Sequence, residues 1–172
     1  SLEDVQRALE REGTPYCIFD EVEENPSVDT VMKARRMGAQ EDADFVIGVG
    51  GGSPMDAAKA IALMLANPEW EEGLLYTKPQ SLKQGQLQPA FPVAEVPTTA
   101  GTGSEVTPYA ILTKNVLPDI ELTTSPEEHA AISFPHLEKK TKQSISHHIY
   151  PALALVDISY LQTSSRNGCI HT

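Results

Sequence analysis

The stretch FVIGVGGGSPMDAAKAIA, residues 45–62, decides the fold that we expect for this chain. Phe45–Val49 is a short apolar run rich in β-branched residues, which favours a buried strand. Glycines follow it directly, and Pro54–Ala66 has the composition of an Ala-rich helix that ends at Asn67–Pro68. A strand, a glycine turn and a helix in this order are typical of one unit of a parallel α/β sheet.

The residues of this turn suit a bound phosphate. Consecutive glycines allow a sharp turn and let a ligand approach the backbone closely. Ser53 is a favourable N-cap, Pro54 suits the first helical position, and Asp56 stands where a capping box places its acid. The start of the helix then offers free N–H groups and a partial positive charge.

Three stricter motifs are absent from the same stretch. Ser53 replaces the last glycine of the dinucleotide fingerprint. A Walker A motif requires a glycine directly before its lysine, whereas Lys59 follows Ala58. Met55 stands where a nucleophile elbow needs glycine. A tight turn without a ligand therefore remains the alternative interpretation.

The flanking sequence alternates helices with short apolar strands. Helices are expected over Leu2–Gly13 and from the Ser27 cap to Glu41, and Glu69–Pro89 is expected to form a surface loop. The predicted strands are Pro15–Phe19, Val93–Val96, Val106–Leu112, Ala152–Asp157 and a short pairing segment at Ser144–Ser146. This order predicts an α/β fold with a mostly parallel sheet and helices on both faces.

A second loop rich in small polar residues, PTTAGTGSE at 97–105, follows the strand predicted at Val93–Val96. Its hydroxyl groups can donate hydrogen bonds to a polar ligand. Loops after neighbouring parallel strands meet at the carboxyl edge of the sheet, where open α/β sheets bind ligands. Taken alone, the loop is also compatible with an ordinary Ser/Thr/Gly turn.

Composition excludes several classes of protein. The 172 residues include 13 Lys and Arg against 24 Asp and Glu, a formal net charge of −11, which argues against nucleic-acid binding. No apolar run is long enough to span a membrane, and we do not expect a membrane to be a partner of this protein. Two cysteines and no signal-peptide pattern at the N-terminus lead us to expect a cytoplasmic protein.

Several motifs resemble the iron-containing, group III alcohol dehydrogenases. They are GGGSPMDAAKAIA at 50–62, PTTAGTGSEVTPYAIL at 97–112, SISHHIYPALALVD at 144–157 and ENPS at 24–27. The resemblance implies a Rossmann-like N-terminal domain, an NAD or NADP cofactor, and Fe²⁺ (or Zn²⁺) in an all-helical C-terminal domain. The reaction it implies is hydride transfer between small alcohols and aldehydes or ketones.

The same resemblance implies which residues bind the nicotinamide dinucleotide. The expected pyrophosphate cradle is Gly51, Gly52 and Ser53, with Asp56 supporting the loop. The residues expected along the cofactor near its nicotinamide half are Thr98, Thr99 and Thr102. Lys142 matches a family lysine that approaches the cofactor, and the alternative interpretation is a solvated lysine in a run of charged residues.

This sequence departs from the family pattern in three places. We expect residues 1–162 to form a nucleotide-binding domain that lacks the family's opening strand. Residues 114–137 are expected to be a surface excursion, and 163–172 a polar tail in place of the helical metal domain. Of the five histidines, His147 and His148 are adjacent and point to opposite faces of a strand. No metal ligand or catalytic residue is assigned.

These departures lead to three expectations about function. The chain alone is expected to be inactive, and its open sheet edge favours a homo-oligomer. The alternatives are a non-catalytic remnant that binds nucleotide or self-associates, and a relative of glycerol dehydrogenase or dehydroquinate synthase. The string TTAGTGSE at 98–105 favours the alcohol dehydrogenase branch.

Overall fold

The computed structural model describes residues 1–116 and 139–161. Its helices are α1 (Leu2–Arg11), α2 (Val28–Gln40) and α3 (Gly52–Ala66). Its strands are β1 (Val46–Gly50), β2 (Val93–Pro97), β3 (Ile111–Val116), β4 (Lys139–Ser144) and β5 (Leu153–Ala154). Short 3₁₀ turns lie at Glu72–Tyr76, Pro79–Ser81, Ser104–Val106 and Ile158–Leu161.

A parallel sheet in the order β1-β2-β5 is the centre of the fold. The register pairs Val46 with Val93 and Gly50 with Pro97, so β1 and β2 end side by side. α3 connects these two strands and packs against both of them. The loops that follow β1 and β2 therefore begin next to each other at one edge of the sheet.

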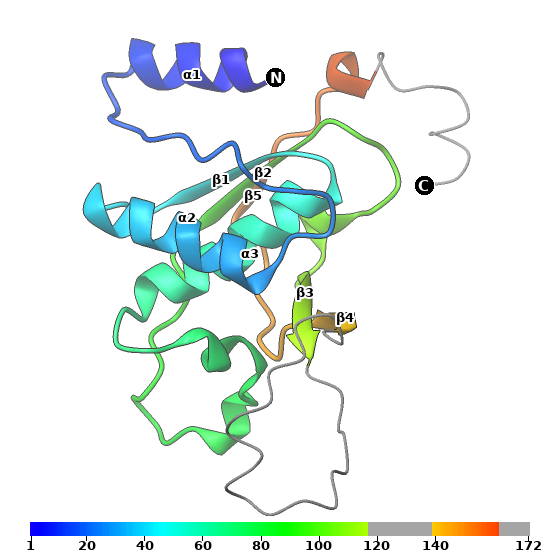
Figure 1. Cartoon of the computed structure of the whole chain (residues 1–172). Helices are drawn as coiled ribbons and strands as arrows, with labels where there is room; N and C mark the ends of the chain where they lie inside the picture. The colour runs from blue at the N-terminus through cyan, green and yellow to red at the C-terminus, as the bar shows by residue number, and fades with distance from the viewer. Residues whose placement is uncertain (117–138, 162–172) are drawn as a thin grey trace, which may run out of the picture.

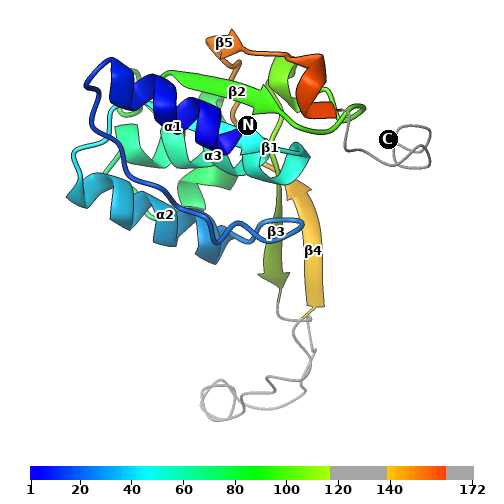
Figure 2. The same ribbon diagram turned by 90° about the horizontal axis from the view of Figure 1, so that it is seen from above.

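Helices lie on both sides of this sheet. Figure 1 shows α1 above the sheet and α2 and α3 below it, and Figure 2 shows α1 in front when the molecule is seen from above. α1 contributes no buried residue, whereas α2 and α3 pack against each other and carry much of the core. The expected α/β fold with a parallel sheet is confirmed.

The core lies mainly between α3, α2 and the sheet. Apolar side chains of α3 such as Met55, Leu63 and Met64 are at most 2% exposed. Leu74 and Leu75, in the segment expected to be a surface loop, are also buried in this core. Burying one such side chain stabilises a fold by about 1.5–3 kcal/mol, which holds α3 firmly under the sheet.

The ribbon β3–β4 is a separate antiparallel pair. It joins the main body where Thr113 N–H donates to the Pro26 carbonyl at 2.8 Å and Ile145 N–H donates to the Ala110 carbonyl at 2.9 Å. The segment after β4 is also fixed, because Ser146 N–H donates to the Leu75 carbonyl at 2.7 Å. The strand that pairs with β3 is therefore Lys139–Ser144, which lies earlier in the chain than the expected segment Ser144–Ser146.

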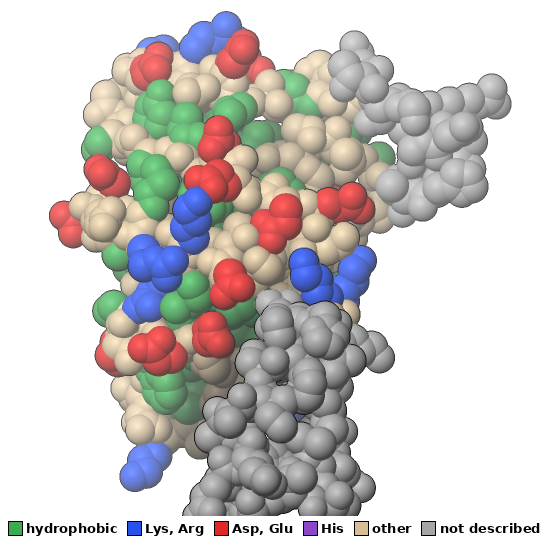
Figure 3. Space-filling view, in the orientation of Figure 1, with side chains coloured by type: hydrophobic (Ala, Val, Ile, Leu, Met, Phe, Trp, Pro, Cys, Tyr) green, Lys and Arg blue, Asp and Glu red, His purple; other side chains and the backbone are tan. Residues whose placement is uncertain are grey.

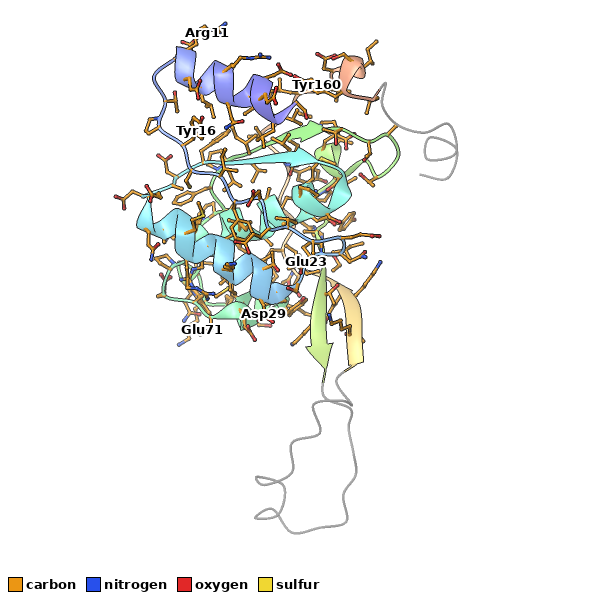
Figure 4. All side chains as sticks on the ribbon, turned by 45° about the horizontal axis from the view of Figure 1, so that its top comes forward. Arg11, Tyr16, Glu23, Asp29, Glu71 and Tyr160 are labelled. Atoms are coloured by element: carbon orange, nitrogen blue, oxygen red, sulfur yellow. The ribbon has the colours of Figure 1, made fainter. Side chains whose placement is uncertain are left out.

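Two further expected strands, Pro15–Phe19 and Val106–Leu112, differ from the structure. Pro15–Phe19 forms no strand, because no neighbouring strand pairs with it among the described residues. Instead the Tyr16 hydroxyl donates to Glu10 at 2.9 Å, and Figure 4 shows Tyr16 below α1. The expected strand Val106–Leu112 begins only at Ile111, since Ser104–Val106 forms a 3₁₀ turn.

The expected buried strand Ala152–Asp157 is short and exposed. Only Leu153–Ala154 pairs with β2, and in this edge position Leu155 and Val156 are 50% and 60% exposed. In Figure 3, acidic and basic side chains are interspersed on the visible face, with hydrophobic side chains between them.

The expected surface excursion 114–137 lies outside the described residues except for Lys114–Val116, which end β3, and the tail 163–172 lies entirely outside them. Within the described part of the chain, no helix combines the length and apolar character that a membrane span requires.

Candidate functional site

The glycine turn (Gly50–Ser53) and the threonine loop (Thr98–Ser104) meet at the carboxyl edge of the sheet. Thr98 N–H donates to the Gly50 carbonyl at 2.8 Å, directly after the paired ends of β1 and β2. The turn is half-buried, and Thr99 and Thr102 are exposed beside it. The structure therefore brings together six of the eight residues expected to bind a cofactor, namely Gly51, Gly52, Ser53, Thr98, Thr99 and Thr102.

Packing explains why glycine occupies this turn. Gly50 has φ +145°, and a Cβ there would lie 2.8 Å from Cγ of Pro54. A Cβ on Gly51 would lie 3.1 Å from Oγ1 of Thr99, and one on Gly52 would lie 3.0 Å from Cγ2 of Thr102. A Cβ at Gly51 or Gly52 would thus push against the threonine loop, whether or not a ligand binds.

The N-terminus of α3 differs from the sequence prediction. Gly51 is the N-cap, so the helix starts two residues before Pro54, and no side chain caps it. The Ser53 hydroxyl accepts a hydrogen bond from Asn25 N–H at 3.1 Å and does not act as the cap. The first turn of α3 contains no acidic residue, and its first N–H groups have no partner within the helix. These groups can bind an anion.

Asp56 supports the threonine loop and not the helix cap. Its carboxylate accepts from the Ser104 hydroxyl at 2.5 Å and from Ile111 N–H at 2.9 Å. The predicted capping box is therefore wrong, because the helix begins earlier and Asp56 lies beyond its first turn. Asp56 was expected to support the glycine turn, whereas its hydrogen bonds here go to Ser104 of the threonine loop and to Ile111 of β3.

Lys59 is fully buried beneath the two loops. Its ammonium group donates to the Ser104 carbonyl at 2.6 Å, the Ser104 hydroxyl at 2.7 Å and the Tyr109 carbonyl at 2.9 Å. The Asp56 carboxylate is 3.8 Å away. All three protons of the ammonium have acceptors, which is the condition under which a charged lysine is tolerated inside a protein.

Glu95 of β2 is a second fully buried ionisable group. Neither carboxyl oxygen has a hydrogen-bond partner, and a Cβ on the paired residue Gly48 would lie 2.5 Å from one of them. Burial raises the pKa of Glu95 to about 9, so the side chain is protonated and neutral at pH 7. Burial also lowers the pKa of Lys59, against the opposing effect of Asp56 and Glu95.

Lys142 lies apart from the glycine turn, on the exposed side of the β3–β4 ribbon. It is paired in register with Thr113 of β3. The Thr113 hydroxyl donates to the Asn25 carbonyl at 2.9 Å, and Asn25 N–H donates to Ser53. Among the described residues, Lys142 makes no hydrogen bond or ion pair with the glycine turn, to which the ribbon is connected through Thr113 and Asn25.

A small cavity of about 100 Å³ lies at the start of α2, away from the two loops. It is lined by Ser27, Val28, Asp29, Glu72, Gly73, Tyr76, Thr113 and Lys114. Figure 4 labels Asp29 and Glu23 near this helix start, where Glu23 accepts from Ser27 N–H at 2.8 Å. None of the expected cofactor-binding residues lines this cavity.

His147 and His148 each contact a residue of the fold outside the two loops, Leu74 and Tyr109 respectively. The His147 ring is buried and lies 2.8 Å from the Leu74 carbonyl, and His148 packs edge-on against Tyr109. His129, His136 and His171 lie outside the described residues. Among residues 1–116 and 139–161, no three His, Cys, Asp or Glu side chains form a group able to hold a metal ion.

Sequence reasoning did not identify Lys59, Ser104 and Glu95 as parts of one cluster. A signal was present for two of them, since Lys59 and Glu95 interrupt apolar segments where a charge is costly without a partner. Because Ser104 and Tyr109 lie 45 and 50 residues from Lys59, the local pattern does not identify them as its partners.

Comparison with known proteins places this geometry in context. The family model described as iron-containing alcohol dehydrogenase matches residues 1–158. The long-chain primary alcohol dehydrogenase of Thermoanaerobacter ethanolicus is 37% identical over 119 residues, which cover 67% of this chain and 29% of that protein. The lactaldehyde reductase of Escherichia coli strain K12 is 34% identical over 110 residues, covering 61% and 26% respectively.

Solved structures give the same comparison in three dimensions. An iron-containing alcohol dehydrogenase from Thermotoga maritima is 39% identical with a TM-score of 0.73, over 98% of this chain and 38% of that one. The crystal structure of another iron-containing alcohol dehydrogenase is 38% identical with a TM-score of 0.73, over 99% and 39%. The chain spans well under half the length of these relatives.

Proposed function

The chain belongs to the iron-containing alcohol dehydrogenase family, and from this premise we propose that its glycine turn and threonine loop bind the diphosphate of a nicotinamide dinucleotide. The family resemblance noted for residues 50–62 and 97–112 is thereby confirmed. The activity proposed for the whole protein is hydride transfer between a small alcohol and its aldehyde or ketone.

The observation that carries the proposal is the uncapped start of α3. Gly51 supplies no side-chain acceptor, and the first turn holds no acidic group to compete with an anion. A diphosphate there would accept hydrogen bonds from free N–H groups and benefit from the helix dipole. The exposed hydroxyl groups of Thr99 and Thr102 lie beside this helix start and can donate further hydrogen bonds.

Within this proposal the residues of the chain bind and orient the cofactor. Gly51, Gly52 and Ser53 would hold the diphosphate, and Asp56 would keep the threonine loop in place through Ser104. A bound nicotinamide supplies the hydride chemistry itself. Lys142 stays a prediction, because nothing in its position on β4 brings it to the turn.

The metal implied by the family does not fit the described residues, because they contain no group of three suitable ligands. We propose that turnover requires parts of the family protein beyond this chain. The test is to add Fe²⁺ or Zn²⁺, NAD⁺ or NADP⁺ and short alcohols to the purified chain. Metal-dependent formation of reduced cofactor would contradict this proposal, since it would place a complete site within 172 residues.

Replacing Ser53 tests the nucleotide site. Ser53→Glu adds a negative charge beside the free N–H groups at the start of α3, a position where an acid does not destabilise a helix. We expect at least about tenfold weaker binding of NADH and NADPH by calorimetry, equivalent to about 1.4 kcal/mol. Ser53→Ala is the matched control, because it also loses the bond from Asn25 but adds no charge.

The control should bind within about threefold of the original chain, a difference of under 1 kcal/mol. Equal affinities for all three proteins would remove the start of α3 from the site. No binding by the original chain would overturn the proposed function of this chain. The ratio of the NADH and NADPH affinities also decides which cofactor the chain prefers.

A further inference from the structure

Lys59 stands out because its side chain is used entirely within the protein. It is 0% exposed, and its ammonium group donates to three oxygens of the segment Ser104–Tyr109. It comes from the third turn of α3, and the sequence between it and Ser104 includes the whole of β2. The side chain therefore joins the helix that follows the first loop to the end of the second loop.

Contacts continue from Ser104 to the glycine turn. Ser104 N–H donates to the Thr102 hydroxyl at 3.4 Å, and the Thr102 methyl carbon lies 3.0 Å from the position that a Cβ on Gly52 would take. Asp56 completes the arrangement by accepting from the Ser104 hydroxyl. The position of Thr102 over the start of α3 thus depends on Ser104, and the position of Ser104 depends on the Lys59 ammonium.

We propose that Lys59 is a positioning residue of the nucleotide site, whose buried ammonium group holds the threonine loop against the glycine turn. This inference rests on the proposed function in so far as it concerns nucleotide affinity. Its structural part, the fixing of the loop, stands on the contacts of Lys59 alone. Lys59 would touch neither the cofactor nor the substrate.

The charges around Lys59 give the proposal a pH signature. The groups that face it are Asp56 from α3, Glu95 from β2 and Glu105 from the 3₁₀ turn after the threonine loop. Because burial lowers the pKa of Lys59, alkaline conditions remove its proton more readily than that of an exposed lysine. An uncharged Lys59 binds its three acceptors less strongly, so the loop is released.

The first experiment measures hydrogen exchange of the chain without nucleotide. Lys59→Met is compared with Lys33→Met, which removes an exposed lysine of α2 that pairs with Glu21. We expect faster exchange over residues 98–111 in Lys59→Met, including Ile111 N–H on the Asp56 carboxylate. Residues of α2 should exchange as before, and Lys33→Met should leave residues 98–111 unchanged. Unchanged exchange over 98–111 in Lys59→Met would overturn the proposal.

Ser104→Ala covers the case in which Lys59→Met does not fold. It removes the hydroxyl shared by Lys59 and Asp56 while keeping the Ser104 carbonyl as an acceptor. A smaller increase in exchange over the same residues, with circular dichroism unchanged, supports the proposal. Exchange over 98–111 equal to that of the original chain refutes it.

The second experiment measures NADH affinity at pH 7 and pH 9.5. We expect Lys59→Met to bind at least about tenfold more weakly at pH 7 and to change little with pH, whereas the original chain and Lys33→Met lose affinity at pH 9.5. Equal profiles would overturn the proposal. If the original chain binds no NADH, the proposed function fails, and the exchange experiment alone decides the role of Lys59.

Discussion

Replacing Glu95 with glutamine should stabilise this protein at neutral pH. The Glu95 carboxyl group is fully buried without a hydrogen-bond partner, and its pKa is raised by burial from 4.5 to about 9. The folded state therefore keeps a proton that the unfolded state loses above pH 4.5. Stability is greatest below pH 4.5 and falls as the pH rises towards about 9. Glutamine has a similar volume and no charge, so it removes this dependence.

The size of the effect follows from the same pKa values. Each pH unit above 4.5, up to about 9, lowers the free energy of unfolding by about 1.4 kcal/mol. At pH 7 the accumulated loss is about 3 kcal/mol, a large fraction of the 5–15 kcal/mol typical of a folded domain. Glu95→Gln should regain about 2–3 kcal/mol at pH 7 and differ little from the original chain near pH 4.

Urea unfolding at pH 5, 7 and 9 measures this difference, with Trp70, the only tryptophan of the chain, as the fluorescent probe. The gap between Glu95→Gln and the original chain should widen with pH. Glu105→Gln is the control, because Glu105 is partly exposed and its removal should change the free energy of unfolding by less than about 0.5 kcal/mol. Parallel pH curves for Glu95→Gln and the original chain would show that Glu95 ionises normally, and the reasoning would fail.

Three further predictions concern other parts of the molecule. Gly52→Ala should weaken NADH binding about three- to tenfold. Adding Thr102→Ser should restore the affinity, because it removes the methyl group that the new Cβ would meet. An affinity unchanged in Gly52→Ala would contradict this packing argument. Burial lowers the pKa of His147 below 6.5, so the free energy of unfolding should fall as the pH drops from 6.5 to 5. Urea unfolding should show a smaller fall in His147→Gln than in His148→Gln, the control at an exposed histidine. The open sheet edge predicts a dimer or larger species by light scattering, reduced by Leu153→Lys on the edge strand β5; a monomer at all concentrations would refute the expected association.

Local sequence pattern predicts those elements whose boundaries depend on nearby residues. The apolar run before the glycines and the Ala-rich run after them became β1 and α3, and the Ser27 cap marks the start of α2. Strands that need a distant partner were predicted less well. Pro15–Phe19 has β-favouring residues, but no strand in the described part of the chain pairs with it, and β5 pairs through two residues only. Strand propensity describes how residues fit a sheet and does not supply the neighbouring strand.

The candidate site shows the same limit at the level of side chains. Residues that follow a strand directly, such as Gly51 and Thr98, could be placed together from sequence because parallel strands end at a common edge. The hydrogen-bond partners of Ser53 and Asp56 could not be predicted, since α3 begins at Gly52 and the two side chains bond to Asn25 and Ser104, 28 and 48 residues away along the chain.

Lys59 shows what sequence can predict about a buried charge. A lysine in the helical run AAKAIALMLA, residues 57–66, is surrounded by apolar side chains on every face of the helix. Since an unpaired buried charge is too costly to keep, such a lysine must have acceptors, and carbonyl or carboxylate oxygens must supply them. That requirement can be read from sequence, but the identity of the acceptors depends on the crossing of β2 and on the turn at Ser104–Val106. A cation inside an apolar helix that follows a glycine turn is therefore a reason to search the next loop of the sheet for its partners.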